Sequence, residues 1–247
     1  MTRLRVKPAD QQAVLATLPN RFAIDEAGGD VHIVSGDALA SAGEGAVMIT
    51  EPGLASAKSL RALSDTGSTI GLALIAAPAL PEAAIAASRA LNDDIPLIVD
   101  AAAETSGSLR AALFELLMLL DTLGCHAEGL RVLADTPSEI VLVVESADGW
   151  NGARLSARHS FRTRFALETV SRTLRREIVI DGTALSIPAE VRLLDASGTR
   201  TALPRYEGGL RASWKALHTR ITEGAGDGGQ VETAIRLLGL LDAAGVT

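Results

Sequence analysis

The chain has 247 residues, enough for one large or two small domains, and its 47% apolar and 21% charged residues are typical of a globular protein. Aromatic residues make up only 3%, so we expect a core built from alanine, leucine, valine and isoleucine. A net charge of −7 argues against a nucleic-acid surface, and the single cysteine, Cys125, excludes a disulfide within the chain and fits a reducing cytoplasm.

We expect no signal peptide, no membrane span and no metal site. Residues 1–9 include basic residues but no apolar segment of the kind that a signal peptide needs. The longest apolar stretch, residues 111–120, is interrupted by Glu115 and indicates a buried helix rather than a span. The four histidines and the cysteine are scattered without metal-ligand spacing, so we expect each of them to be structural.

The first hundred residues alternate between short apolar runs and helical patterns. Strands are expected at residues 4–6, 21–25, 31–34, 46–50, 69–76 and 96–101. Helices are expected at residues 11–18, 55–63 and 81–91, with a loop or weak helix at 35–45. Because strands that alternate with helices form parallel βαβ units, this part predicts a parallel sheet.

The pattern changes after residue 100. A long apolar helix at residues 109–123 ends at Gly124, a favourable residue for helix termination. Strands then follow one another at residues 129–133, 139–146, 153–161, 164–171, 175–181, 184–188 and 190–194. Two helices, at residues 211–222 and 230–244, flank a polar, glycine-rich loop. A run of strands after a βαβ region predicts a second domain with a mostly antiparallel sheet.

Several segments resemble the Gfo/Idh/MocA oxidoreductase family. Residues 2–6 correspond to the first strand of that family, and residues 47–52 (VMITEP) resemble the strand that ends in its Glu-Lys-Pro motif. Residues 106–124 resemble its glycine-rich turn and the helix that carries an aspartate and a histidine, and residues 206–214 resemble a late segment that enters a helix.

The resemblance implies a two-domain α/β plus α+β fold. Residues 1–78 would form a reduced Rossmann-like parallel domain, and residues 79–247 a domain with a mostly antiparallel open sheet. The C-terminal helix, residues 230–244, would return onto the first domain. In this family the open sheet commonly serves subunit contact, so the resemblance also implies a homodimer or a paralogue subunit bound through that sheet.

The dinucleotide fingerprint of the family is missing from the corresponding segment, Lys7–Gln12, which contains no glycine. The glycines of G-x-G-x-x-G allow a tight turn and let the pyrophosphate approach the backbone at a helix N-terminus. Here Pro8 lacks an amide donor and Asp10 would repel the pyrophosphate. Asp25 or Glu26 could take the ribose hydroxyls, but we favour a solvated strand end for both.

The lysine of the Glu-Lys-Pro motif is also missing. Its position is taken by Glu51, which reverses the charge, whereas Pro52 is retained. Between Val34 and Ala46 only about a dozen residues remain where the family has a full helix that contacts the cofactor.

The third loss concerns the catalytic pair. The position of the family's histidine falls at Phe114 or Glu115, and that of its aspartate at Arg110 or Ala111. Glu115 could act as a base, because burial in an apolar helix can raise a carboxyl pKa. We favour the alternative that Glu115 is a carboxylate at the helix edge.

Arginines recur with even spacing along the strand expected at residues 153–161, at Arg154, Arg158 and Arg162. Even spacing places them on one side of a strand, where guanidinium groups could bind an anion or a carboxylate. Arg172, Arg175 and Arg176 add positive charge nearby in the sequence. Alternatively these arginines form a solvated sheet face that is paired with Glu145, Glu168 and Glu177. We favour the second interpretation. His159, on the opposite side, is expected to be a packed core or interface residue rather than a base.

Three losses together make a conventional NAD(P)-dependent reaction unexpected. The leading hypothesis is a non-catalytic relative that binds a partner or a ligand, with no cofactor. The second is an enzyme acting on a sugar, polyol or related small molecule with a non-standard nucleotide site, for which Glu51, Glu115, Arg158 and His159 are the residues to test. The third is that weak NAD(P) binding persists.

Overall fold

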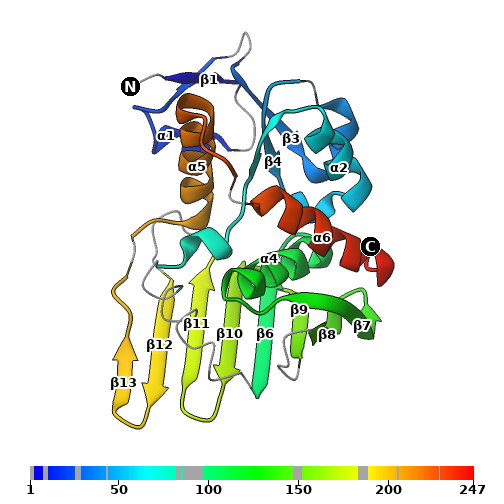
Figure 1. Ribbon diagram of the computed structural model, residues 1–247, viewed down its shortest axis with the longest axis vertical. Helices are drawn as coiled ribbons and strands as arrows, with labels where there is room; N and C mark the ends of the chain where they lie inside the picture. Colours follow the sequence, from blue (N-terminus) through cyan, green and yellow to red (C-terminus); the bar gives the residue numbers. More distant parts are fainter. Residues whose placement is uncertain are drawn as a thin grey trace.

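The computed structural model describes residues 3–7, 11–25, 29–42, 44–81, 85, 97–146, 152–182, 189–204, 206–227 and 229–247. These residues form two sheets with helices between and around them, shown in Figure 1 with the parallel sheet above and the larger sheet below. The expected strand at residues 184–188 and most of the expected helix at 81–91 lie outside the described residues. The division of the chain at residue 78 stays a prediction.

The upper sheet is parallel, as the alternation of strands and helices predicted. In the described part of the chain it consists of β1 (Leu4–Val6), β2 (Phe22–Ile24), β3 (Val31–Ser35), β4 (Ala46–Thr50) and β5 (Thr69–Leu72), in the order β2-β1-β3-β4-β5. The chain moves outward from β1 to β2 and then crosses to β3, so the order reverses between β1 and β3. Open parallel sheets bind ligands outside the carboxyl ends of their strands, near such a reversal.

Short helices connect these strands. They are α1 (Gln12–Ala16), η1 (Gly36–Ser41), η2 (Pro52–Leu54), α2 (Ala57–Asp65) and η3 (Ala77–Ala79), where η marks a 3-10 helix. Residues 35–45, expected to be a loop or weak helix, contain only η1. Ser56 begins α2 with a capping box, in which its hydroxyl accepts from the Ser59 amide and the Ser59 hydroxyl accepts from the Ser56 amide.

The lower sheet is mostly antiparallel, as predicted. Its described strands are β6 (Ile98–Thr105), β7 (Ala127–Thr136), β8 (Glu139–Ser146), β9 (Ala153–His159), β10 (Arg164–Val170), β11 (Arg175–Asp181), β12 (Glu190–Asp195) and β13 (Gly198–Thr201). The order is β13-β12-β11-β10-β6-β9-β8-β7, and among these pairs only β6 and β9 run parallel. Helix α4 (Leu109–Thr122) covers one face of the sheet, and the other face, the outer face, points away from the helices (Figure 1).

Several strands differ from the sequence prediction, and for three of them the physical reason is clear. β5 ends at Leu72 instead of residue 76, because the Leu74 amide turns back to donate to the Leu72 carbonyl. β6 continues to Thr105 instead of residue 101, because it lies between β9 and β10 and pairs with both along this length. The exposed edge strand β13 was not predicted, since its sequence, GTRT, has no buried side.

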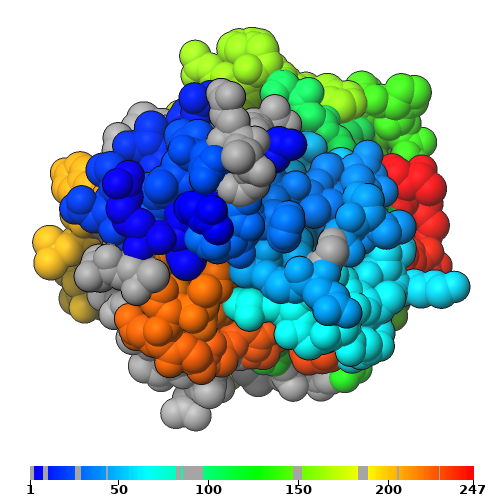
Figure 2. Space-filling model, turned by 90° about the horizontal axis from the view of Figure 1, so that it is seen from above, coloured from blue at the N-terminus to red at the C-terminus, as the bar shows by residue number. Residues whose placement is uncertain are grey.

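Two helices from the end of the chain return to the parallel sheet. Trp214 of α5 (Gly209–Glu223) is fully buried and packs edge-to-face on Phe22 of β2, with ring centroids 5.1 Å apart. On the other side of the sheet, Asp242 of α6 (Gln230–Ala243) accepts from the first amide of α2, at Ala57. In Figure 2 the N-terminal strands and α5 accordingly form one continuous surface, with α6 at its edge.

The core follows this layering. A large apolar cluster joins α2, α4 and α6 to β4, β5 and the inner face of the lower sheet, while a smaller one lies under α1 and α5. The buried side chains are mainly aliphatic, as the composition predicted. Among the described residues, no helix combines the length and apolar character that crossing a membrane requires.

Candidate functional site

A cavity of about 250 Å³ lies between the two sheets. Its described walls are the residues that follow β4 and β5, the end of β6, the N-terminal half of α4, the start of β10 and parts of α1 and α5. The polar side chains among them include Thr50, Glu51, Thr105, Ser108, Glu115 and Thr163. We call this cavity the inter-sheet pocket. It opens at the carboxyl ends of parallel strands, where α/β proteins of this topology bind ligands.

Two glycines allow the walls of the pocket to approach closely. A Cβ atom at Gly53 would lie 2.6 Å from the Cα atom of Ala111, so η2 packs directly on the backbone of α4. A Cβ atom at Gly209 would lie 2.0 Å from the carbonyl oxygen of Ile75, so the first turn of α5 rests on the turn after β5. Any larger residue at either position would force these walls apart.

Glu115 is a buried carboxylate, with 6% of its surface exposed. It accepts hydrogen bonds from the backbone amides of Ile75, at 2.8 Å, and Ala76, at 3.0 Å. Burial raises the pKa of the Glu115 carboxyl to about 7, against the opposing effect of the two amide donors. The favoured prediction of a carboxylate at the helix edge is therefore wrong. The turn that ends β5 leaves two amides without sheet partners, and Glu115 accepts from both.

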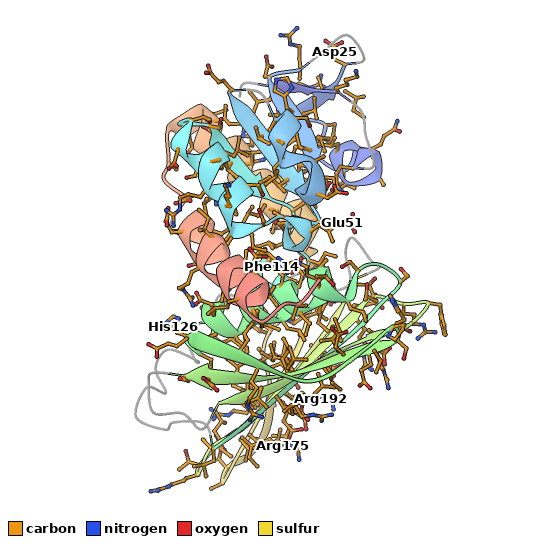
Figure 3. The ribbon with its side chains drawn as sticks, turned by 90° about the vertical axis from the view of Figure 1, so that its right-hand side faces the viewer. Asp25, Glu51, Phe114, His126, Arg175 and Arg192 are labelled. Carbon is orange, nitrogen blue, oxygen red and sulfur yellow. The ribbon has the colours of Figure 1, made fainter. Side chains whose placement is uncertain are left out.

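Glu51 lies at the mouth of the pocket and is exposed. Its backbone adopts a left-handed conformation, with φ of 47° and ψ of 54°, and no other non-glycine residue in the described part of the chain has a positive φ. A Cβ atom at Gly107 would lie 3.7 Å from Glu51 Oε1, so this carboxylate sits beside the turn that begins α4. Figure 3 shows Glu51 and Phe114 at the level between the two sheets.

Arg110 takes no part in the lining of the pocket, although it precedes Ala111, which does. Its guanidinium is buried and donates to the carbonyl oxygens of Gly53 at 2.9 Å and Ala55 at 3.2 Å, and also to that of Val246. It also pairs with Asp242 at 2.6 Å. The arginine thus connects α4 to the η2 turn and to the C-terminal residues, and it fixes the turn that carries Glu51.

Of the segment after β1 the structure describes Lys7 and Gln11 onward, whereas Pro8, Ala9 and Asp10, as well as Glu26, lie outside the described residues. Helix α1 has five residues, and Gln11 at its start provides no side-chain cap. The Gln11 amide oxygen accepts from the indole of Trp214 at 3.3 Å, and Gln11 itself lines the pocket. Asp25, a candidate for the ribose hydroxyls, lies 3.9 Å from a guanidinium nitrogen of Arg5 and well apart from Glu51 in Figure 3. In sequence, Lys7–Gln12 offers no glycine for the tight turn that lets a pyrophosphate approach the backbone.

The arginines expected on one strand face lie on the outer face of the lower sheet, away from the pocket. Arg154 pairs with Asp100 at 3.6 Å, and Arg158 pairs with Glu104, both across the parallel β6–β9 ladder. The partners of these two arginines therefore belong to β6. Glu168 and Glu177, which the sequence suggested as partners of the basic face, pair with Arg175, which Figure 3 places on this same outer face.

Two expectations about strand β9 need correction. Arg162 lies beyond the end of β9, in the turn to β10, with its guanidinium 5.5 Å from the centroid of the Phe161 ring. It therefore does not share a strand face with the other two arginines. His159, the last residue of the strand, is exposed and is not a core residue, whereas its place in an interface stays a prediction.

The structure thus brings Glu51 and Glu115 together in one pocket and leaves Arg154, Arg158, Arg162 and His159 outside its described lining. Sequence reasoning missed the hydroxyl groups of the site, Thr50, Thr105, Ser108 and Thr163. Their positions could have revealed them, since each lies at the end or start of a helix or strand that reaches the pocket. Among the described residues, no group of histidine, cysteine and carboxylate side chains could hold a metal ion.

The architecture has two parts, a Rossmann-like parallel sheet followed by a mostly antiparallel one. No protein-family model and no curated sequence matches the chain. Several solved structures do match the chain. UDP-N-acetylglucosamine 3-dehydrogenase GnnA from Acidithiobacillus ferrooxidans superposes with a TM-score of 0.66 at 11% identity, covering 99% of this chain and 97% of that one.

Two further structures agree. A mutant of KijD10, a 3-ketoreductase from Actinomadura kijaniata, in complex with TDP-benzene and NADP, has a TM-score of 0.69 at 14% identity, with 98% of this chain and 96% of that one covered. The protein yvaA from Bacillus subtilis has a TM-score of 0.60 at 12% identity, with 97% and 87% covered. These neighbours are of the Gfo/Idh/MocA type, so the resemblance seen in the sequence is confirmed for the fold. At such low identity, activity has to be argued from the residues of this chain.

Proposed function

We propose that this chain is a divergent relative of the Gfo/Idh/MocA oxidoreductases that binds a small, hydroxyl-rich molecule in the inter-sheet pocket. In this proposal it acts as a binding or accessory subunit and does not carry out NAD(P)-dependent hydride transfer by itself. The observation that carries the proposal is the cavity of about 250 Å³ lined by both hydroxyl and apolar groups at the carboxyl ends of β4 and β5.

The size and lining of the pocket support a small ligand. Its volume lies below the roughly 300–1,000 Å³ of sites for drug-sized molecules. Thr105, Ser108 and Thr163 offer hydroxyls that can both donate and accept hydrogen bonds, which suits a polyol or a sugar. Phe114 and Phe165 provide apolar surface for the carbon side of such a molecule.

The missing chemistry supports a role without hydride transfer. The segment Lys7–Gln12 contains no glycine, and the helix that follows it is a single short turn. At the two positions where the family would present a lysine and a histidine, the pocket has Glu51 and the pair Phe114–Glu115. Each change removes a donor or a proton carrier that the conventional reaction uses.

An enzyme acting on a small molecule is the second candidate, and Glu115 favours it. A carboxyl whose pKa is raised to about 7 can both accept and release a proton near neutral pH. It also lines the pocket, within reach of a ligand hydroxyl. If a reaction is found, Glu115 is the residue to test first as its general base.

We further propose that the outer face of the lower sheet binds a second copy of the chain or a paralogue. Its support is a shallow hollow of about 300 Å³ on this face, lined by small residues such as Ala102, Ser156 and Ala166 between paired charges. Such a face is open, and alternating charges favour self-complementary contact. Sedimentation equilibrium tests this proposal, and a monomer at high micromolar concentration contradicts it. We also propose a cytoplasmic location, because a chain with one cysteine forms no internal disulfide, as fits a reducing compartment.

The first experiment is a titration of the purified full chain with NAD(H) and NADP(H), and separately with the hexitol sorbitol. Thermal stability is followed in both cases and nicotinamide fluorescence in the first. A ligand that binds only the native state raises its apparent stability. We expect stabilisation by the polyol and none by millimolar cofactor. A clear shift at micromolar cofactor would overturn our interpretation of Lys7–Gln12, and the search for activity would then turn to sugar and polyol oxidation.

A further inference from the structure

The inter-sheet pocket has an acidic lining. Glu51 and Glu115 both contribute to it, and no lysine, arginine or histidine is among the lining residues that the structure describes. The nearest arginine in sequence, Arg110, is turned away, because its donors are taken by backbone carbonyls and by Asp242. A ligand in this pocket therefore meets two carboxylates and no side-chain cation.

The N-terminus of α4 does not reverse this charge. Helix N-termini carry partial positive charge and attract anions. Here the Ser108 hydroxyl accepts from the Ala111 amide at 3.2 Å, and Glu51 lies next to Gly107 in the preceding turn. The chain thus supplies its own anion at the N-terminus of α4, one of two long helices, with α5, that begin at the described wall of the pocket. An anionic ligand would have to approach against that carboxylate.

Glu51 holds this position at an energetic cost. Left-handed backbone conformation is unfavourable for residues other than glycine and asparagine, by about 1 kcal/mol or more. The turn at Glu51 is held by the η2 hydrogen bond from Leu54 to the Glu51 carbonyl, at 2.9 Å, and by the packing of η2 on α4. A strained residue with a charged side chain at a pocket mouth is a candidate for ligand contact.

Glu115 is the second carboxylate of the pocket. Each of its oxygens accepts one backbone amide, and an ionised carboxylate has room for about four donors. No cation from the described residues pairs with it, although only 6% of its surface is exposed to solvent. A buried carboxylate without a counter-charge is costly, and a cationic ligand group would reduce that cost.

We infer that the inter-sheet pocket selects a small polyol that bears an ammonium group and discriminates against the corresponding anion. This inference rests on the proposed function, because it assigns a ligand class to the same pocket. The ammonium group donates to Glu115 or Glu51, and the hydroxyl groups of the ligand pair with Thr105, Ser108 and Thr163. No change of bonding in the ligand is involved.

Three matched probes test the inference. Glucamine, sorbitol and gluconate share a hydroxylated carbon chain and differ in one end, which is an ammonium group, a neutral alcohol or a carboxylate. Binding of each to the purified full chain is measured by calorimetry near pH 8, where Glu115 is largely ionised. We expect glucamine to bind about tenfold or more tightly than sorbitol, and gluconate to bind more weakly than sorbitol.

Substitutions assign the preference to the two carboxylates. Glu115→Gln keeps the shape of the side chain, and Glu51→Gln changes an exposed residue that poses little risk to folding. We expect each to reduce the ratio of glucamine to sorbitol affinity, and Glu51→Lys to shift the preference toward gluconate. Glu128→Gln, an exposed carboxylate on β7 away from the pocket, is the matched control and should leave the ratio unchanged.

The outcomes separate this inference from the proposed function. If sorbitol binds and glucamine binds no better, or if the preference survives both glutamine variants, the inference is wrong while the polyol pocket stands. If gluconate binds most tightly to the wild-type chain, the charge argument fails outright. If none of the three probes binds at tens of millimolar, the proposed function fails together with the inference.

Discussion

The outer face of the lower sheet and the inter-sheet pocket carry charge in opposite ways. On the outer face, Asp100 and Glu104 of β6 stand in register with Arg154 and Arg158 of β9, so each carboxylate has a cation beside it. In the pocket, Glu51 and Glu115 have no such partner among the described residues. The face resembles an ordinary solvated surface, whereas the pocket keeps uncompensated charge.

The difference shows where charge has been left available for a ligand. Exposed ion pairs contribute little to stability because water and salt screen them. A buried carboxylate without a cation is costly, so its retention calls for a reason other than stability. Arginine spacing drew attention to the outer face in the sequence, but the described structure gives the pocket the unusual electrostatics. Four predictions test this contrast, in descending order of magnitude.

The largest effect is expected from replacing the buried arginine. Arg110→Met leaves the carbonyls of Gly53 and Ala55 and the carboxylate of Asp242 without their donor. Asp242 is partly exposed, so the cost comes mainly from the carbonyls, at on the order of 1–3 kcal/mol for each buried acceptor left without its donor. Urea unfolding should show a loss of this size in the free energy of unfolding, without a change in m-value. A loss below about 1 kcal/mol would mean that the connection to the C-terminal residues is dispensable.

The second effect concerns pH. Because the folded chain holds the Glu115 proton up to about pH 7, whereas the unfolded chain releases it near 4.5, this group stabilises the fold most at low pH. Its contribution is fully present below the lower value and is lost as pH rises through the upper one, up to about 3 kcal/mol in all. Glu115→Gln should flatten this part of the stability profile. Parallel profiles for the wild type and the variant between pH 5 and 8 would contradict the assignment.

The third effect is a separation of stability from binding at the pocket mouth. Glu51→Gly relieves the left-handed backbone but removes the carboxylate next to α4. We expect the free energy of unfolding to change by no more than about 1 kcal/mol, while the preference for an ammonium-bearing polyol falls. Calorimetry and thermal unfolding of the same preparation measure both. A large loss of stability would instead assign Glu51 a structural role in the η2 turn.

The smallest effect is expected on the outer face. Arg158→Met makes the same substitution as at Arg110, but the Arg158 side chain is 64% exposed and its partner is Glu104 at the surface. No measurable change in the free energy of unfolding is expected for the monomer. Should this variant be as destabilised as the one at Arg110, the contrast between face and pocket does not hold. A change in oligomeric state without loss of stability would support the subunit-contact proposal.

The sequence was sufficient for the order and type of most elements that the structure describes. Continuous apolar runs such as residues 46–50 and the amphipathic helix at 230–244 have a strong period of their own, and both appear where expected. The resemblance to oxidoreductases of this fold could also be recognised in the sequence. The strand boundaries were predicted less well, because β6 and β13 depend on pairing with neighbouring strands rather than on local sequence preference.

The candidate site, too, could be predicted only in part from the sequence. By itself the sequence determined that the glycine turn, the lysine and the histidine of the family are missing, because these are facts of residue identity. Only the tertiary structure decided what replaces them. The turn after β5 presents two amides to Glu115, the η2 turn carries Glu51 to the start of α4, and Arg110 is drawn away to the C-terminal residues. Burial and hydrogen bonding set the charge state of such groups, and both depend on segments that are distant in the chain.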